Sequence, residues 1–99
     1  MLNIKKTADQ DKLTIALEGR LDTLTSPELE TEIRGDIDGV KELVLDLSKL
    51  EYISSAGLRV LLLAQKTMNR QGSMVVTNAN ESIMEIFEVT GFSDILTIE

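Results

Sequence analysis

Residues 41–77 read KELVLDLSKLEYISSAGLRVLLLAQKTMNRQGSMVVT, and this stretch decides the fold. Leu43–Leu47 is a dense apolar run, typical of a strand that is covered on both faces and pairs in parallel. Apolar residues then recur at helical spacing as far as Met68, and Gly72 is a fitting helix end. Met74–Thr77 forms a second short strand. A strand, a helix and a strand in this order predict a right-handed crossover between parallel strands.

The segment before this unit predicts an N-terminal hairpin. Lys12–Glu18 places apolar residues at every second position, which is the period of a half-buried strand. Leu2 and Ile4 indicate a weaker strand, and Asp9-Gln10-Asp11 between the two is a polar turn. These segments therefore pair with each other.

A helix is expected after the hairpin, starting at Ser26-Pro27-Glu28. Ser26 can cap it, Pro27 suits the first helical position, and Glu28 faces the positive end of the helix dipole. Gly39 terminates this helix. Its buried stripe has a spacing of four and consists of Leu29, Ile33 and Ile37.

The chain ends with a third helix and a short strand. The helix contains Ser82, Ile83, Ile86 and Phe87 and stops near Gly91, and the strand contains Ile95, Leu96 and Ile98. The resulting order is β-β-α-β-α-β-α-β. We therefore expect an α/β fold, with one mixed β-sheet covered by helices and a single domain over residues 1–99.

Composition excludes several classes of function. The chain has 99 residues, no Cys and no His, so thiolate nucleophiles, Cys-based metal sites and a Ser-His-Asp triad are impossible within it. The net charge of −7 argues against nucleic acid and anionic membrane surfaces as partners. MLNIKK has no signal-peptide character, and the longest apolar run is Val60–Ala64. We expect a soluble cytoplasmic protein without a cofactor.

The most informative segment is EYISSAGLRVLL, residues 51–62, which follows a buried strand and enters an apolar helix. The simpler interpretation is that one serine caps the helix, and the residues alone favour it. Two serines, an alanine and a glycine in a row also form a surface that another protein's backbone can approach. A phosphate on a serine here would be stabilised by the helix N-terminus. Gly57 stands alone, so the segment is not a glycine-rich phosphate loop.

A second segment of interest is EGRLDTLTSPEL, residues 18–29, in which Asp22, Thr23 and Thr25 connect a strand to a helix. Turn chemistry alone explains these residue types. Crossover geometry, however, places this loop and the loop before Ser54 at carboxyl ends of strands, where sites of α/β proteins usually lie. Asp22 is therefore a candidate site residue.

Across its whole length the chain resembles the STAS family, the domain of bacterial anti-sigma factor antagonists. EGRLDTLTSPEL resembles the family's G-x-[LI]-D segment and first helix, and KELVLDLSKLEYISSAGLRVLL its buried strand and D-S-[ST]-G-L phosphorylation segment. QGSMVVTNANESIMEIFEVTGF and DILTI are similar to the family's C-terminal strands and third helix. Each piece alone is weak, and the combination is specific.

This resemblance implies a partner-switching cycle without catalysis by the chain itself. The unphosphorylated protein would bind an anti-sigma factor that is also a serine kinase, phosphorylation would end the interaction, and a phosphatase would reset it. The acceptor serine matches Ser55, the next small residue Ala56, the glycine Gly57 and the loop aspartate Asp22. The expected contact surface consists of Asp22, Thr23, Ser54, Ser55, Ala56, Gly57 and Leu58.

The sequence departs from the family pattern at one position. Phosphorylated members usually carry Asp just before the acceptor, and this chain has Ser54 there, which leaves Asp22 as the nearer carboxylate. Ser54 itself is then a candidate decoy or second acceptor. An alternative role is a STAS subunit of a phospholipid-type ABC transporter or a larger signalling assembly without a phosphorylation cycle. Nucleotide binding stays open. An enzymatic role is least favoured because a phosphate loop and metal-binding carboxylates are missing.

Overall fold

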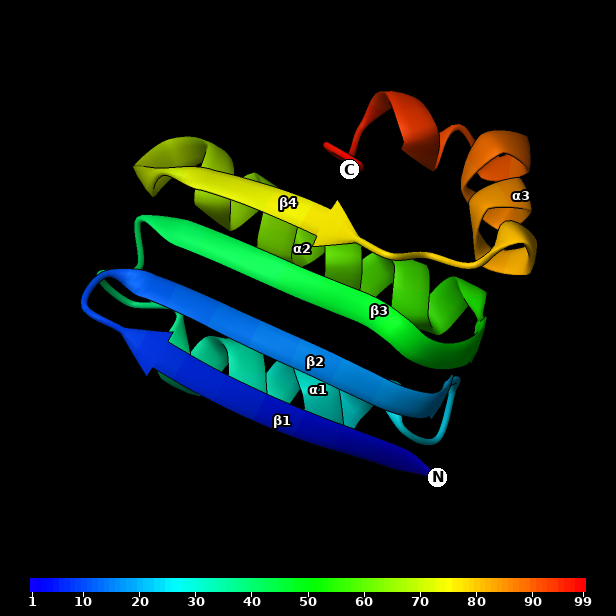
Figure 1. Cartoon of the computed structure of the whole chain (residues 1–99), viewed down its shortest axis with the longest axis horizontal. Helices are drawn as coiled ribbons and strands as arrows, with labels where there is room; N and C mark the ends of the chain where they lie inside the picture. Colours follow the sequence, from blue (N-terminus) through cyan, green and yellow to red (C-terminus); the bar gives the residue numbers. More distant parts are fainter.

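A mixed four-stranded sheet forms the centre of the fold in the computed structural model, which describes residues 1–99 (Figure 1). Strand β1 (Leu2–Asp9) runs antiparallel to β2 (Lys12–Leu21), as the expected hairpin requires. β2 is parallel to β3 (Glu42–Ile53), and β3 is parallel to β4 (Ser73–Thr77). The spatial order of the strands is β1-β2-β3-β4.

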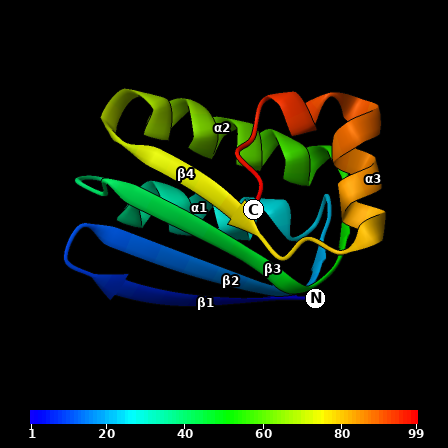
Figure 2. The same cartoon turned by 45° about the horizontal axis from the view of Figure 1, so that its top comes forward.

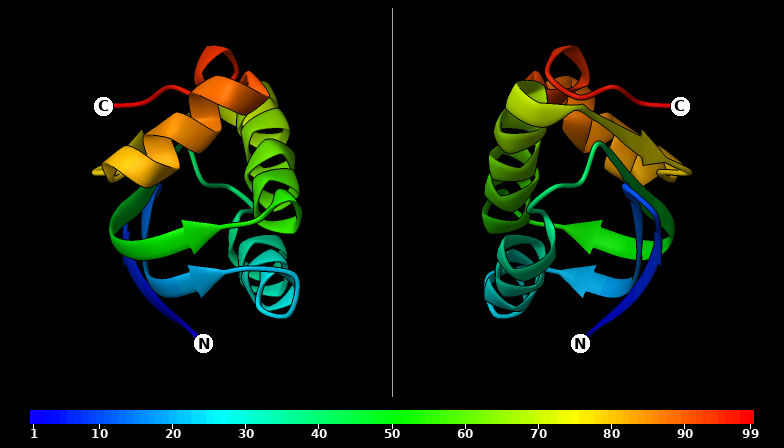
Figure 3. Two further views of the ribbon diagram at one scale, coloured as in Figure 1. Left: turned by 90° about the vertical axis from the view of Figure 1, so that its right-hand side faces the viewer. Right: turned by 90° about the vertical axis from the view of Figure 1, so that its left-hand side faces the viewer.

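Helices α1 (Ser26–Asp36) and α2 (Ser55–Gln71) connect the parallel strands and lie on the same side of the sheet (Figure 3). The strand order never reverses, so two right-handed crossovers bring their helices to one face. Helix α3 (Glu81–Thr90) and the short 3₁₀ helix η1 (Phe92–Asp94) lie beyond the carboxyl end of β4 (Figure 1).

Strand β3 is covered on one face only, and the expectation of two covered faces is wrong. Leu43, Leu45 and Leu47 are buried, whereas Val44 and Asp46 between them are only half-buried. The dense apolar composition of the strand hides this alternation, because Val44 lies on the open face of the sheet. The strand also continues well beyond the expected end.

One cluster of 23 buried apolar residues fills the space between the sheet and the helices. Ile83 and Phe87 extend this core into α3, and both are fully buried. Asn80 holds the start of α3 in place, because its Oδ1 accepts a hydrogen bond from Ile83 N at 2.9 Å and its Nδ2 donates to Leu50 O at 3.0 Å. None of the helices is both long and apolar enough to cross a membrane.

The expected order of elements is confirmed, and its last β element is reduced to a single bridge. Ile98 forms an isolated parallel bridge with Val76 of β4. Val76 N donates to Thr97 O at 2.9 Å, and Glu99 N donates to Val76 O at 2.9 Å. The turn that starts in η1 continues through Ile95 and Leu96, whose N–H groups donate to Phe92 O at 3.0 Å and 2.8 Å, so only this short contact remains.

Helix α1 begins one residue earlier than expected, and the prediction that Ser26 caps it is wrong. Thr25 occupies the cap position without a side-chain cap bond, and Ser26 is the first helical residue. The Ser26 hydroxyl donates instead to Asp22 O at 2.5 Å. Pro27 lies in the first turn, as the missing N–H of proline allows.

Candidate functional site

The ends of β2 and β3 bring the two candidate loops together, as the crossover predicts. Leu21 pairs with Ile53 at the carboxyl ends of these parallel strands. Directly after this pair, Ser54 N donates a hydrogen bond to Leu21 O at 2.9 Å. The Asp22 loop and the start of α2 therefore share one end of the molecule, at the right of Figure 1.

Ser54 and Ser55 have different roles at the start of α2. Ser54 is the N-cap in an extended conformation, and its Oγ accepts a hydrogen bond from Gly57 N at 3.4 Å. Ser55 is the first residue of the helix, is exposed, and makes no side-chain hydrogen bond. The cap interpretation therefore holds for Ser54, while the hydroxyl of Ser55 is free and accessible.

Asp22 is held in a fixed orientation beside this serine pair. Its Oδ1 accepts hydrogen bonds from Leu24 N at 3.0 Å, from Thr25 N at 3.1 Å and from Thr25 Oγ1 at 3.1 Å. The bond from the Thr25 backbone N–H is the main reason why the pKa of Asp22 is lowered from its ordinary value. Its Oδ2 lies 3.9 Å from Arg20 Nε. The site thus contains a carboxylate that is ionised at neutral pH.

Gly57 and Leu58 are buried. The expected contact surface includes both residues, and in the structure neither is exposed on it. A Cβ at Gly57 would lie 2.8 Å from Leu21 Cγ and 2.9 Å from Ile53 Cγ1. The glycine therefore allows the first turn of α2 to pack directly on the ends of β2 and β3. Leu58 belongs to the apolar stripe of the helix and packs in the core.

Two exposed residues at this end were missed by the sequence analysis. Leu24, next to Thr23 in the Asp22 loop, has 86% of its surface exposed. Tyr52 is 37% exposed, and its ring lies 4.4 Å from the guanidinium carbon of Arg20. A leucine within an otherwise polar loop is the signal that could have identified the first of these. Apolar surface thus flanks the accessible positions Asp22, Thr23, Ser54, Ser55 and Ala56.

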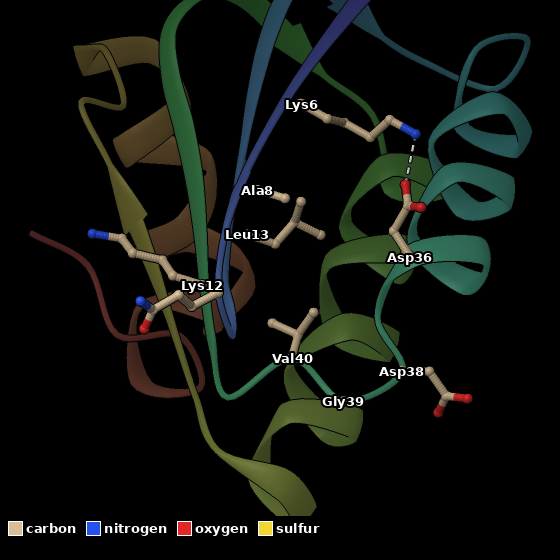
Figure 4. Close-up of a pocket in the computed structure, with 9 residues that line it drawn as sticks. Lys6, Ala8, Lys12, Leu13, Asp36, Asp38, Gly39 and Val40 are labelled. Carbon is tan, nitrogen blue, oxygen red and sulfur yellow. Dashed lines mark hydrogen bonds and ion pairs between the residues drawn. The ribbon is translucent and has the colours of Figure 1, made fainter.

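The site is an open surface rather than a cavity. None of the pockets in the structure is lined by any predicted site residue. A pocket of about 340 Å³ lies at the opposite end of the strands, near the β1–β2 turn and Val40 (Figure 4). Lys6 crosses its rim to Asp36 at 2.6 Å and also pairs with Glu32. Lys6, Lys12 and Asp36 are already in ion pairs, and Asp38 is the one unpaired charged group of the lining, so there is no set of convergent free polar groups for a ligand.

The chain matches the STAS domain over residues 3–99. It is 39% identical to BtrV of Bordetella bronchiseptica, a candidate anti-sigma factor antagonist, over 99 residues that cover 96% of this chain and 85% of the relative.

Solved structures share the fold. The crystal structure of an anti-sigma factor antagonist from Mycobacterium paratuberculosis has a TM-score of 0.90 at 21% identity, covering 99% of this chain and 85% of the other. The antagonist SpoIIAA has TM-scores of 0.77 in its unphosphorylated form and 0.76 in the phosphorylated Bacillus form, each at 16% identity. These pairs cover all of this chain and 87% and 91% of the other chains.

Proposed function

The chain belongs to the STAS domain family, and we propose that it acts as an anti-sigma factor antagonist whose binding is switched off by phosphorylation of Ser55. It binds an anti-sigma factor that is also a serine kinase, and so frees a sigma factor. A phosphatase resets the cycle. The name of the Bordetella relative supports the binding role, and the existence of SpoIIAA in two phosphorylation forms supports a switch on this fold.

The observation that carries the proposal is the free hydroxyl of Ser55 at the first helical position, beside the Asp22 carboxylate loop. The kinase transfers the γ-phosphoryl group of ATP to Ser55 Oγ. A P–O ester bond forms at the serine, the bond to the β-phosphate oxygen breaks, ADP leaves, and the hydroxyl proton passes to a base or to solvent. Ser54 keeps its cap bond throughout, so the acceptor can react without loss of a helix contact.

The phosphate changes the surface and leaves the fold in place. It adds about −1.5 to −2 charge, and the N-terminus of α2 stabilises an anion at this position. Two like charges about 4 Å apart repel by about 4 kcal/mol at an effective dielectric constant of about 20. Since about 1.4 kcal/mol is tenfold in affinity, one such contact lowers binding about a thousandfold.

A paired-bait experiment tests this function. Wild-type protein, Ser55→Asp and Ser55→Ala are used to capture partners from cell extract, and captured proteins are identified by mass spectrometry. Wild type and Ser55→Ala are expected to retain an anti-sigma factor with a kinase domain, and Ser55→Asp to lose it with a nearly unchanged thermal midpoint. Retention at wild-type strength by Ser55→Asp, or capture of a transporter ATPase in place of the anti-sigma factor, contradicts the proposal.

The acceptor is assigned by incubation with the purified partner and ATP. Wild type should gain the mass of one phosphate at Ser55, and Ser55→Ala should gain none. Ser54→Ala is the matched control, because it removes the neighbouring hydroxyl and only a helix cap. Phosphate found on Ser54 in the wild-type protein would overturn the assignment.

A further inference from the structure

The outward side of α2 carries positive charge along its length. Arg59, Lys66 and Arg70 are all exposed on this helix. No acidic residue occurs between Glu51 and Glu81, although the chain has 17 acidic residues and a net charge of −7. Figure 3 shows that no other element covers the outer side of α2. The protein therefore has one locally basic helix face on an acidic background.

These cations are not neutralised within the molecule. None of the three makes an ion pair, although four other cations of the chain have carboxylate partners, namely Lys6, Lys12, Arg20 and Arg34. On the neighbouring helix α1, Glu30 is paired with Arg34 and Glu32 and Asp36 with Lys6, and the remaining acidic residue, Glu28, forms no ion pair with α2. The charge on α2 is thus available to something outside the chain.

Two leucines lie among the cations. Leu62 and Leu63 are only half-buried, and neither is in the core cluster or among the apolar residues packed against it. At 100° per residue they share the outward side of the helix with the three cations and with Ser55. The surface extends about 22 Å from Ser55 to its last residue. We name it the basic stripe, composed of Arg59, Leu62, Leu63, Lys66 and Arg70.

Resting on the proposed function, we propose that the basic stripe docks on an acidic surface of the anti-sigma factor, with the leucines covered at its centre. The positive charge of the stripe favours an acidic protein surface as its partner. Ser55, the proposed phosphorylation site, lies on the same side of α2 at the start of the stripe. Arg59 lies four residues after Ser55, so a phosphate there faces this guanidinium on the same side of the helix. The phosphate on Ser55 then neutralises Arg59, which is no longer available to the partner, and it also presents negative charge to the acidic surface of the partner.

Charge reversal tests this surface with a matched control. The anti-sigma factor captured by the wild-type bait is purified, and its affinity is measured by calorimetry against Arg59→Glu/Lys66→Glu and against Lys5→Glu/Lys41→Glu. Both double variants change the net charge equally, and Lys5 and Lys41 are exposed cations off α2 that have no ion pair. The stripe variant is expected to lose at least about tenfold in affinity, while the control stays within about threefold. Wild-type affinity should also fall as salt is raised from 50 to 300 mM, which shortens the screening length about 2.4-fold.

The outcomes separate this inference from the proposed function. If wild type binds the anti-sigma factor and Ser55→Asp does not, yet both double variants bind alike, the stripe is not the docking surface and the function stands. If wild type binds no anti-sigma factor, both proposals are overturned. Vesicles of phosphatidylglycerol serve as the competing probe. If the protein is retained on these vesicles only when Arg59 and Lys66 are present, and the double variant binds the partner as wild type does, the stripe binds a membrane and the proposal is contradicted.

Discussion

Asp46 is a carboxylate in the middle of β3 that ties this strand to Asn78, the residue that follows β4. Its Oδ1 accepts hydrogen bonds from Asn78 Nδ2 at 3.1 Å and from Ser48 N at 3.0 Å. The bond from Asn78 is the main cause that lowers the pKa of Asp46 from its ordinary value. Asn78 follows β4 with a positive φ of 61°, a conformation that asparagine tolerates better than most residues. This pair therefore depends on the charge of Asp46.

The lowered pKa predicts an acid-dependent loss of stability. A carboxyl whose pKa is lower in the folded than in the unfolded state stabilises the fold above about pH 4, and this contribution is lost as the pH falls through the folded pKa. We expect Asp46→Asn to lower the free energy of unfolding at pH 7 by up to about 1 kcal/mol and to lose less than wild type between pH 7 and pH 3. Urea denaturation at both pH values measures this.

Asp38→Asn is the control for this prediction, because Asp38 is exposed and makes no hydrogen bond. It should leave the pH dependence of the wild-type protein unchanged. Equal pH dependence of wild type and Asp46→Asn would show that the hydrogen bonds to Asp46 do not contribute to acid sensitivity.

Single residues show how far local patterns predict the site. The adjacency of the Asp22 loop and Ser54 follows from strand-helix-strand order, and the structure confirms it through the bond between Ser54 N and Leu21 O. The backbone conformation decides whether Ser54 or Ser55 caps α2. Two adjacent serines in a sequence do not reveal that conformation. The error at Ser26 has the same origin, since its hydroxyl bonds back to Asp22 O instead of capping α1.

At the scale of elements, the spacing of apolar residues predicts whether a segment is a helix or a strand better than it predicts where the element ends or which of its faces is buried. The three helices and the hairpin are where the apolar spacing indicates. The coverage of β3 could not be read from its composition, because Leu43, Val44 and Leu45 are all apolar and only the strand order decides which face the helices cover. The expected last strand is too long because a run of apolar residues does not reveal that Ile95 and Leu96 bond back to Phe92 O in a turn that follows η1.

The packing of α2 on the sheet predicts a sharp response at Gly57. A methyl group there would meet Leu21 Cγ, which is the branch point of its side chain, and Ile53 Cγ1, which is bonded directly to Cβ, so neither atom is a flexible side-chain end. We expect Gly57→Ala to lower the free energy of unfolding by about 1–3 kcal/mol through overpacking. Chemical denaturation measures the change.

Gly35 of α1 is the matched control, since a Cβ there meets no atom within 4 Å. Gly35→Ala should leave stability unchanged or raise it by up to about 1 kcal/mol, because alanine favours the helix. If Gly57→Ala were as stable as Gly35→Ala, the close contact of the first turn of α2 with the strand ends would not constrain this position.

At the scale of the whole molecule, the sheet has two edges that are protected in different ways. On β1, Lys6 points toward α1 and is held there by Glu32 and Asp36, which places an inward charge on the edge. On β4, the segment 97–99 covers the backbone of Val76 with two hydrogen bonds. The inward charge of Lys6 on β1 and the segment 97–99 on β4 therefore limit pairing between copies of the chain through the sheet edges.

Removal of residues 97–99 should therefore weaken the β4 edge. The truncated chain loses the two backbone bonds to Val76, each worth about 0.5–1.5 kcal/mol, and the packing of Ile98 on the core. We expect the free energy of unfolding to fall by about 1–3 kcal/mol from the two bonds alone and further from the loss of Ile98, and the uncovered edge to promote association at high concentration. Denaturation and sedimentation velocity across a hundredfold concentration range measure both effects. Thr97→Ala/Glu99→Ala keeps the backbone bonds and should behave as wild type, so equal behaviour of the truncated chain and this control would show that the backbone contact protects nothing.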